Sequence, residues 1–303
     1  MGKTLILWPD ETEDFAKKIA TNYPELVDVK TLYRQVNKPL RALRKLLSYL
    51  NLSTELFTAN WTDDINNYDR IIIDANIINR TIPKVIRKKG YKGRIIYWYW
   101  NPVLNCVNPN KINKELCELW SFSKDDCKNY DLKYNTTYYI PDISINNRHT
   151  NTSIDFFFIG RDKGRYLRLR KLGKKLAEMG FICDFRIIRD STSSNTGKYQ
   201  SFLPYSKIQQ LIQSSKILVE FLQEKQCGLS LRTMEAIYYG KKIITDSTFI
   251  RDEPFYSPKR ILIYDNFTTE QDIKNFFFEE IHEDDILKWR NFYSFPEWLN
   301  RFK

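Results

Sequence analysis

Residues 226–246 read Gln226-Cys-Gly-Leu-Ser-Leu-Arg-Thr-Met-Glu235-Ala-Ile-Tyr-Tyr-Gly240-Lys-Lys-Ile-Ile-Thr-Asp246. Apolar side chains recur at helical spacing from Leu231 to Ile237, and Gly240 fits the left-handed position just past a helix end. Two isoleucines then begin a short run that is typical of a buried strand. A loop, a helix and a buried strand in this order form one repeat of an alternating α/β fold.

The same stretch carries polar groups that a helix does not itself require. Gly228 and Ser230 favour a tight turn whose backbone N–H groups stay free, and Arg232 adds a positive charge at the start of the helix. Free amides at a helix N-terminus bind phosphate, and a nearby cation strengthens such a site. Glu235, one turn into the helix, is placed to accept hydrogen bonds from sugar hydroxyls. We therefore predict a nucleotide site, with Thr233 as a further donor.

Strands and helices alternate along both halves of the chain. In the first half, strands are predicted at 5–8, 26–32, 70–74, 94–100, 120–122 and 137–140, with helices at 14–21, 41–49 and 125–130 and a basic helix before Gly90. In the second half, strands are predicted at 155–159, 181–188, 216–221, 243–244 and 260–264, with a helix that ends at Gly180 and another at 206–213. Alternation of this kind specifies parallel sheets with helices on both faces.

A polar, Asn- and Thr-rich segment without periodicity, residues 142–153, separates the two halves. We therefore expect two Rossmann-like domains, at 1–148 and 149–303, each with a parallel sheet. The aromatic-rich residues 283–303 predict amphipathic helices that pack on a core. Ligands of open α/β sheets bind outside the carboxyl ends of the strands, so the turns after the strands carry the candidate site.

A second candidate turn follows the predicted strand at 155–159. Its sequence is Gly160-Arg-Asp-Lys-Gly164-Arg, in which glycines let the backbone approach a phosphate closely. The predicted phosphate-binding residues of this turn are Gly160, Arg161, Lys163 and Arg165.

The composition bounds the class of protein. The chain has 303 residues, of which 42% are apolar, and a mean hydropathy of −0.51. No apolar run approaches the ~18 residues that cross a bilayer, and the first residues do not resemble a signal peptide. Five cysteines without a Cys-x-x-Cys spacing indicate reduced thiols rather than disulfides or a zinc site. We therefore expect a globular, cytoplasmic protein.

The net charge of +11, from 48 Lys and Arg against 37 Asp and Glu, favours an anionic partner. Nucleic acid, anionic lipid headgroups and phosphate-bearing small molecules all meet that description. Basic residues gather at 84–89, which is either a solvated helix face or a patch that contacts anionic lipid.

Several of these segments together resemble the GT-B glycosyltransferases, above all the bacterial transferases of lipopolysaccharide and capsular polysaccharide biosynthesis. The likeness lies in the Gly-x-Ser-Leu-Arg-Thr-x-Glu segment that begins at Gly228, the Trp-Ser-Phe-Ser-Lys-Asp-Asp element at 120–126, the turn at 160–165 and the approach to the last strand at 254–264. It covers most of residues 70–265, and the first seventy residues match in pattern only.

The resemblance implies a metal-independent enzyme that moves a sugar from a nucleoside diphosphate sugar to a glycan or lipid-linked acceptor in surface polysaccharide biosynthesis. It implies that Glu235 accepts hydrogen bonds from the donor ribose and that Arg232 pairs with the pyrophosphate and stabilises the leaving diphosphate. No metal or other cofactor is expected, since the sequence has two histidines and no Asp-x-Asp pair in a plausible donor loop. Peripheral contact with the anionic inner face of the cell membrane is a further expectation, and nucleic acid is not an expected partner.

The stereochemistry of the reaction stays open. Many retaining members of the family carry a Glu-x7-Glu motif, and Glu235 fits its second glutamate. Cys227 stands at the position of the first. An inverting enzyme needs a base near the acceptor hydroxyl. Asp10, just past the first predicted strand, and Asp74, at the end of another, are the candidate bases.

Two other classes of function are compatible with the sequence. A nucleic-acid-binding protein would use the same positive charge and abundant aromatic residues. A nucleotide-sugar epimerase on the same fold would bind the donor and need no acceptor. No recognised nucleic-acid-binding motif is present, and dependence on an acceptor would separate the epimerase from a transferase.

Overall fold

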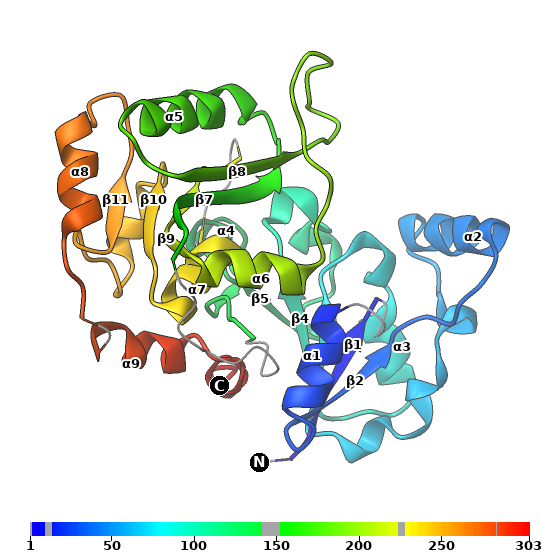
Figure 1. Cartoon of the computed structure of the whole chain (residues 1–303). Coiled ribbons are helices and arrows are strands. Elements are labelled where there is room, and N and C mark those ends of the chain that lie inside the picture. The colour runs from blue at the N-terminus through cyan, green and yellow to red at the C-terminus, as the bar shows by residue number, and fades with distance from the viewer. Residues whose placement is uncertain (1, 10–13, 141–151, 224–227, 283) are drawn as a thin grey trace. The chain divides into compact units, whose positions relative to one another are not determined.

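The computed structural model describes residues 2–9, 14–140, 152–223, 228–282 and 284–303 (Figure 1). The chain divides into two compact units. The first comprises Met1–Ile140 together with Trp298–Lys303, and the second comprises Pro141–Glu297. Each unit is built on its own parallel sheet.

The first unit has a six-stranded sheet in the order β2-β1-β3-β4-β5-β6. Its strands are β1 (Thr4–Trp8), β2 (Val27–Thr31), β3 (Arg70–Asp74), β4 (Arg94–Tyr99), β5 (Glu118–Ser121) and β6 (Lys133–Tyr134). All five neighbouring pairs are parallel, and the register places Ile6 of β1 beside Val29 of β2 and Ile72 of β3. Because the central strands are covered on both faces, they are continuous runs of β-branched and aromatic residues.

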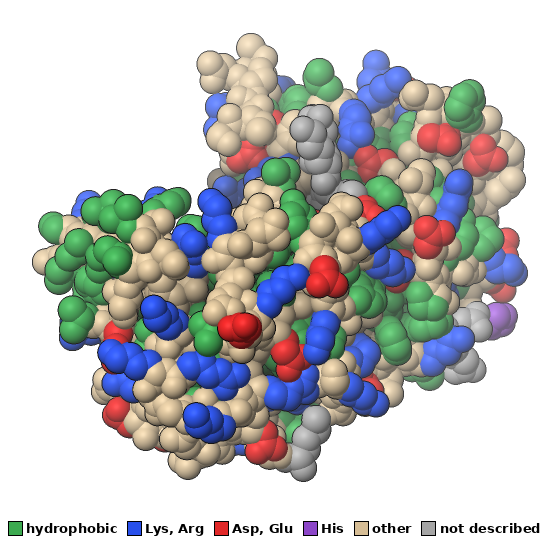
Figure 2. All heavy atoms as spheres, turned by 180° about the vertical axis from the view of Figure 1, so that it is seen from behind, with side chains coloured by type: hydrophobic (Ala, Val, Ile, Leu, Met, Phe, Trp, Pro, Cys, Tyr) green, Lys and Arg blue, Asp and Glu red, His purple; other side chains and the backbone are tan. Residues whose placement is uncertain are grey.

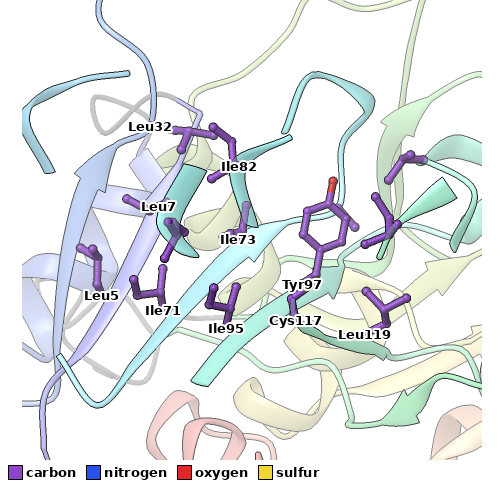
Figure 3. Packing of buried hydrophobic residues seen from close by; sticks show 14 of the residues in the cluster. Leu5, Leu7, Leu32, Ile71, Ile73, Ile82, Ile95, Tyr97, Cys117 and Leu119 are labelled. Carbon is purple, nitrogen blue, oxygen red and sulfur yellow. The ribbon is translucent and has the colours of Figure 1, made fainter. Parts of the chain in front are cut away.

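The helices of the first unit are α1 (Asp14–Asn22), α2 (Lys38–Tyr49), α3 (Ile82–Lys88) and α4 (Lys124–Tyr130). Short 3-10 helices lie at Glu55–Phe57, Asn60–Asp63, Ile65–Asn67, Ile77–Asn79, Val103–Asn105 and Pro109–Lys111. Alternate residues of β1, β3 and β4 point to one face of the sheet, where they form a core with Ile82 of α3 (Figure 3). Leu5, Ile71 and Ile95 of that core are almost completely buried.

The chain returns to the first unit at its C-terminal end. The ring of Trp298, in α10 (Phe295–Asn300), lies 5.4 Å from that of Trp98, and the ring of Phe302 lies 5.0 Å from that of Trp120. Nη1 of Arg94 donates to the carbonyl of Phe302 at 2.6 Å. The six last residues therefore complete the core of the first unit, whereas the sequence assigned them to the second domain.

The second unit has a five-stranded sheet in the order β11-β10-β9-β7-β8. Its strands are β7 (Ile154–Arg161), β8 (Cys183–Ile188), β9 (Ser215–Glu220), β10 (Lys242–Thr245) and β11 (Ile261–Ile263). Its helices are α5 (Tyr166–Glu178), α6 (Tyr205–Gln213), α7 (Leu231–Tyr239), α8 (Glu270–Phe278) and α9 (Asp284–Phe292), with a 3-10 helix at Phe249–Asp252. Phe156, Leu172 and Ile217 are among the buried residues that join helices to this sheet.

The order of strands in the second sheet reverses beside β7. From β7 the chain forms β8 on one side and then crosses to form β9 on the other side. The carboxyl ends of β7 and β9 therefore flank a topological switch point, where open α/β sheets bind their ligands.

Most predicted elements are present, but one predicted strand is wrong and one helix was not predicted. The strand predicted at 137–140 is wrong, because the sixth strand of the sheet is β6. Tyr138 is buried by aromatic packing, with its ring 4.2 Å from Trp298 and 5.1 Å from Trp100, so its apolar neighbourhood reflects packing and not strand pairing. Helix α8 was not predicted; a capping box between Thr269 and Asp272 begins it. Residues 142–151 of the predicted linker (142–153) lie outside the described residues.

Candidate active site

A pocket of about 180 Å³ lies in the second unit at the switch point between β7 and β9. Its walls come from the ends of these two strands and from the first residues of α7. The lining residues are Phe158, Ile159, Arg165, Val219, Glu220, Phe221, Leu222, Ser230, Leu231 and Arg232. The pocket therefore combines apolar side chains with two guanidinium groups and the carboxylate of Glu220.

Glu220, the last residue of β9, holds the N-terminus of α7 to the sheet. Its side chain is buried, and Oε1 accepts hydrogen bonds from the hydroxyls of Ser230 and of Thr233, the latter at 2.8 Å. Oε2 accepts from the hydroxyl of Thr245 in β10 at 2.7 Å. Three hydroxyl donors offset the cost of burying a carboxylate. Sequence reasoning missed Glu220, although an acid at the end of an otherwise apolar strand is a signal that could have found it.

Ser230 is the N-cap of α7. Its Oγ accepts from the backbone N–H of Arg232 at 3.0 Å and from that of Thr233 at 3.4 Å. The backbone N–H groups of Arg232 and Thr233, at the helix N-terminus that the sequence assigned to a phosphate, are therefore capped in this structure by the serine itself. Gly228, before the cap, has a φ of 97°, which suits the tight turn predicted for it.

Arg232 and Glu235 form a pair at the wall of the pocket. Nη1 of Arg232 lies 2.6 Å from Oε2 of Glu235, and its Nη2 donates to the carbonyl of Ile159 at 3.1 Å. The hydroxyl of Tyr205 donates to Oε1 of Glu235 at 2.8 Å. Burial raises the pKa of Glu235, and the charge of Arg232 opposes that rise. Glu235 therefore orients Arg232 and does not itself line the pocket.

Arg165 also lines the pocket. Its guanidinium donates to the carbonyls of Phe221, of Arg161 at 2.5 Å and of Asp162 at 3.1 Å. Burial lowers the pKa of Arg165. A Cβ on Gly160 would lie 3.3 Å from the ring of Phe158 and 3.4 Å from Nη2 of Arg165, so both groups pack closely against this glycine.

The turn that contains Arg161 and Lys163 has its amides occupied. Lys163 adopts a left-handed conformation with φ of 49°, and its N–H donates to Asp190 at 2.9 Å. The N–H of Gly164 donates to the hydroxyl of Thr192 at 2.9 Å. The side chains of Arg161 and Lys163 are exposed beside this turn. The loop after β8 thus satisfies the amides that the sequence assigned to a phosphate.

The remaining predicted residues lie elsewhere. Asp74 ends β3 in the first unit and is partly buried. Asp10 and Cys227 lie outside the described residues.

Within the described ranges, no group of three or more His, Cys, Asp or Glu side chains could hold a metal ion. Among the helices of those ranges, none combines the length and the hydropathy needed to cross a membrane.

No protein-family model and no curated protein matches this sequence. Solved structures do match it. An α,α-trehalose-phosphate synthase (UDP-forming) from Burkholderia vietnamiensis superimposes with a TM-score of 0.61 at 9% identity, over 100% of this chain and 96% of that one. The apo form of the lipopolysaccharide outer core galactosyltransferase WaaB gives a TM-score of 0.54 at 15% identity, over 99% and 97% of the two chains. Sucrose-phosphate synthase from Thermosynechococcus elongatus gives 0.57 at 8% identity, over 99% and 97%.

These neighbours are GT-B glycosyltransferases. The chain has the GT-B fold. The predicted pair of Rossmann-like domains with parallel sheets, followed by a helical C-terminal segment, is thereby confirmed. In the GT-B fold of this chain, the pocket belongs to the C-terminal Rossmann-like unit, to which the sequence assigned the nucleotide site.

Proposed function

We propose that this protein is a glycosyltransferase that moves a sugar from a nucleoside diphosphate sugar to an acceptor. The observation that carries the proposal is the pocket at the switch point of the second sheet, with Arg165 and Arg232 in its walls. Guanidinium groups bind phosphate oxygens through charge-assisted hydrogen bonds, and the two in this pocket supply the positive charge that a diphosphate requires. The GT-B fold of the chain supports the same reaction class.

In the proposed reaction, Arg232 neutralises the charge that develops on the leaving diphosphate. The guanidinium is already fixed by Glu235 and by the carbonyl of Ile159, so little reorganisation accompanies the transition state. The exposed Arg161 and Lys163 are proposed to add further positive charge. A ribose contact by Glu235, as the resemblance implies, would require its Oε2 to exchange Arg232 for a hydroxyl donor. Such a site works without a metal ion.

For the acceptor, we propose a glycan or lipid-linked saccharide of surface polysaccharide biosynthesis, with the protein in peripheral contact with an anionic membrane. The likeness to WaaB, a lipopolysaccharide outer core galactosyltransferase, supports this choice. For an inverting reaction, Asp10 and Asp74 are the proposed bases. Asp74 lies at the carboxyl end of β3, the edge of the sheet where ligands of open α/β folds bind.

A thermal-shift screen with UDP, GDP, TDP and CMP tests the donor site. UDP is the first choice because the synthase from Burkholderia vietnamiensis is UDP-forming. At a hundredfold excess over its Kd, a bound nucleotide stabilises the fold by about 2.7 kcal/mol, which raises Tm by about 5 °C or more. R232A should abolish the shift, while R170A, which removes an exposed arginine of α5 outside the pocket, should keep it. If none of the four nucleotides raises Tm, the proposed donor site is wrong.

Two measurements separate the alternatives. An epimerase would convert or release the donor in the absence of acceptor, whereas a transferase releases nucleoside diphosphate only when acceptor is present. A nucleic-acid-binding protein would bind single-stranded DNA or RNA with strong salt dependence and would not respond to nucleotides. Acceptor-dependent release of nucleotide is the result that the proposal requires.

A further inference from the structure

Helix α2 of the first unit exposes a stripe of large apolar side chains. Leu40, Leu43 and Leu46 are between 41% and 54% exposed, although leucines at this spacing normally face a core. The stripe continues past the helix with Leu50, Leu52 and Leu56, which are between 50% and 79% exposed. Figure 2 shows hydrophobic side chains gathered over α2, at the left of the view. We call residues 38–56 with these six leucines the α2 surface.

One narrow side of α2 attaches it to the domain. The hydroxyl of Ser48 donates to the carbonyl of Ile78 at 3.0 Å, and the guanidinium of Arg44 lies 4.2 Å from the ring of Tyr33. Leu47 packs against the core of the first unit. The helix is therefore fixed in place by residues other than the exposed leucines, and its orientation does not depend on them.

Positive charge borders the apolar stripe. Lys38, Arg41 and Lys45 are exposed on α2, which contains no acid. The one acid in the sequence between residues 38 and 57 is Glu55, and its carboxylate lies 2.8 Å from Nζ of Lys88 and 3.1 Å from Nζ of Lys89. Leucines bordered by cations, with the nearby acid neutralised, form the pattern of a helix that lies in a membrane interface.

This pattern favours an anionic bilayer over the other occupants of an apolar face. Lysine and arginine beside the leucines would meet lipid phosphates at the headgroup level while the leucines enter the acyl boundary. A second copy of the chain would bring the same cations to the same place and would be repelled. Nucleic acid would pair with the cations and leave the leucines in water.

We propose that the α2 surface docks the protein on an anionic membrane, with the leucines buried in the interface and Lys38, Arg41 and Lys45 on lipid phosphates. The inference names the contact site for the peripheral membrane association proposed above and rests on that part of the proposed function. It does not require the sugar-transfer reaction, so the two can fail separately.

The test is co-flotation with vesicles of phosphatidylcholine alone and of phosphatidylcholine mixed with phosphatidylglycerol, without nucleotide or acceptor. We expect the wild-type protein to float with the mixed vesicles only. L43S/L46S should lower the partition coefficient about tenfold or more, and R41Q/K45Q should lower it by a similar factor and reduce its salt dependence. The matched controls lie in the second unit: F267S/F278S removes two exposed apolar rings, and R170Q/K171Q removes two exposed charges. Both controls should float like wild type.

Hydrogen exchange locates the contact independently of any variant. Addition of mixed vesicles should slow amide exchange in peptides that span residues 38–56 more than in peptides of the second unit. Exchange unchanged at 38–56, or flotation of L43S/L46S equal to that of wild type, would overturn the proposal. So would a concentration-dependent dimer that L43S/L46S dissociates, since the leucines would then bind a second copy. R232A should float normally, and L43S/L46S should keep its response to nucleotide, so that loss of the donor site and loss of membrane docking are told apart.

Discussion

Arg232 and Glu235 lie one helical turn apart at the start of α7, with Nη1 of the arginine 2.6 Å from Oε2 of the glutamate. The glutamate is fully buried, and the arginine side chain is 14% exposed. Arg232 lines the pocket, whereas Glu235 lies behind it and is also bound by the hydroxyl of Tyr205. The carboxylate therefore influences the pocket through the guanidinium that it holds.

This arrangement predicts strong coupling between the two residues. Removing one member of a buried ion pair leaves the other without its counter-charge and costs about 3 kcal/mol or more. We expect R232A and E235Q each to lower the free energy of unfolding by about that amount. The double variant should cost less than the sum by about 1 kcal/mol or more, because the second change removes a group that has already lost its partner. Urea unfolding of the four proteins measures this coupling, and strict additivity would contradict the pair.

Replacement of Arg232 should lower turnover far more than replacement of an exposed arginine outside the pocket. Loss of a preorganised donor to a developing charge typically costs about 10²-fold or more in turnover, and we expect R232A to lose that much. R232K should fall between R232A and wild type, since an ammonium keeps the charge but loses the planar pair of donors. Acceptor-dependent release of nucleotide measures the rates, with R170A as control. Turnover of R232A equal to that of R170A would remove Arg232 from the proposed reaction.

The local pattern of the sequence predicted most of the fold. Strand β3 has the bounds predicted for it, and Gly240 ends α7 in the left-handed conformation with φ of 65°. Both depend on short-range chemistry, namely β-branched runs and a glycine that tolerates positive φ. The strand predicted at 137–140 failed because aromatic packing and strand pairing favour the same residue types.

The contacts of the site depend on parts of the chain that are distant in sequence. Glu220 is bound by hydroxyls from the N-cap of α7, from α7 itself and from β10, and no local pattern brings these groups together. For the leucines of α2, the sequence showed the local pattern but not what the leucines contact. Their helical spacing was visible, but spacing alone does not tell whether an apolar stripe meets a core or a membrane.

Ser230 should contribute more to stability than an ordinary N-cap. Loss of a cap lowers the free energy of unfolding by about 1 kcal/mol. Loss of the hydroxyl would also leave buried Glu220 without one of its donors, which would lower it by about a further 1–2 kcal/mol. We therefore expect S230A to lower the free energy of unfolding by about 2–3 kcal/mol. T269A removes the N-cap of α8, which lies on the exposed surface, and should cost about 1 kcal/mol. Urea unfolding compares them, and equal costs would show that the contact with Glu220 contributes nothing.

Glu118 should make the stability of the first unit depend on pH. Burial by itself would raise the pKa of Glu118, but hydrogen bonds from Arg94, Lys133 and Trp120 outweigh it and lower the pKa to about 2. A carboxyl whose pKa is lower in the folded than in the unfolded protein stabilises the fold above its unfolded pKa of about 4.5. That contribution is lost as the pH falls from about 4.5 to about 2.

We therefore expect E118Q to be less stable than wild type by about 1–2 kcal/mol at pH 7, a value reduced for solvent screening of a partly exposed pair. The difference should shrink steadily below about pH 4.5, because wild-type Glu118 then loses its charge while glutamine has none to lose. Urea unfolding between pH 7 and pH 3 measures it, with E115Q, an exposed neighbour, as the control for loss of one negative charge. A difference between wild type and E118Q that stays constant over this range would mean that the charge of Glu118 does not stabilise the junction of β4, β5 and the C-terminal end.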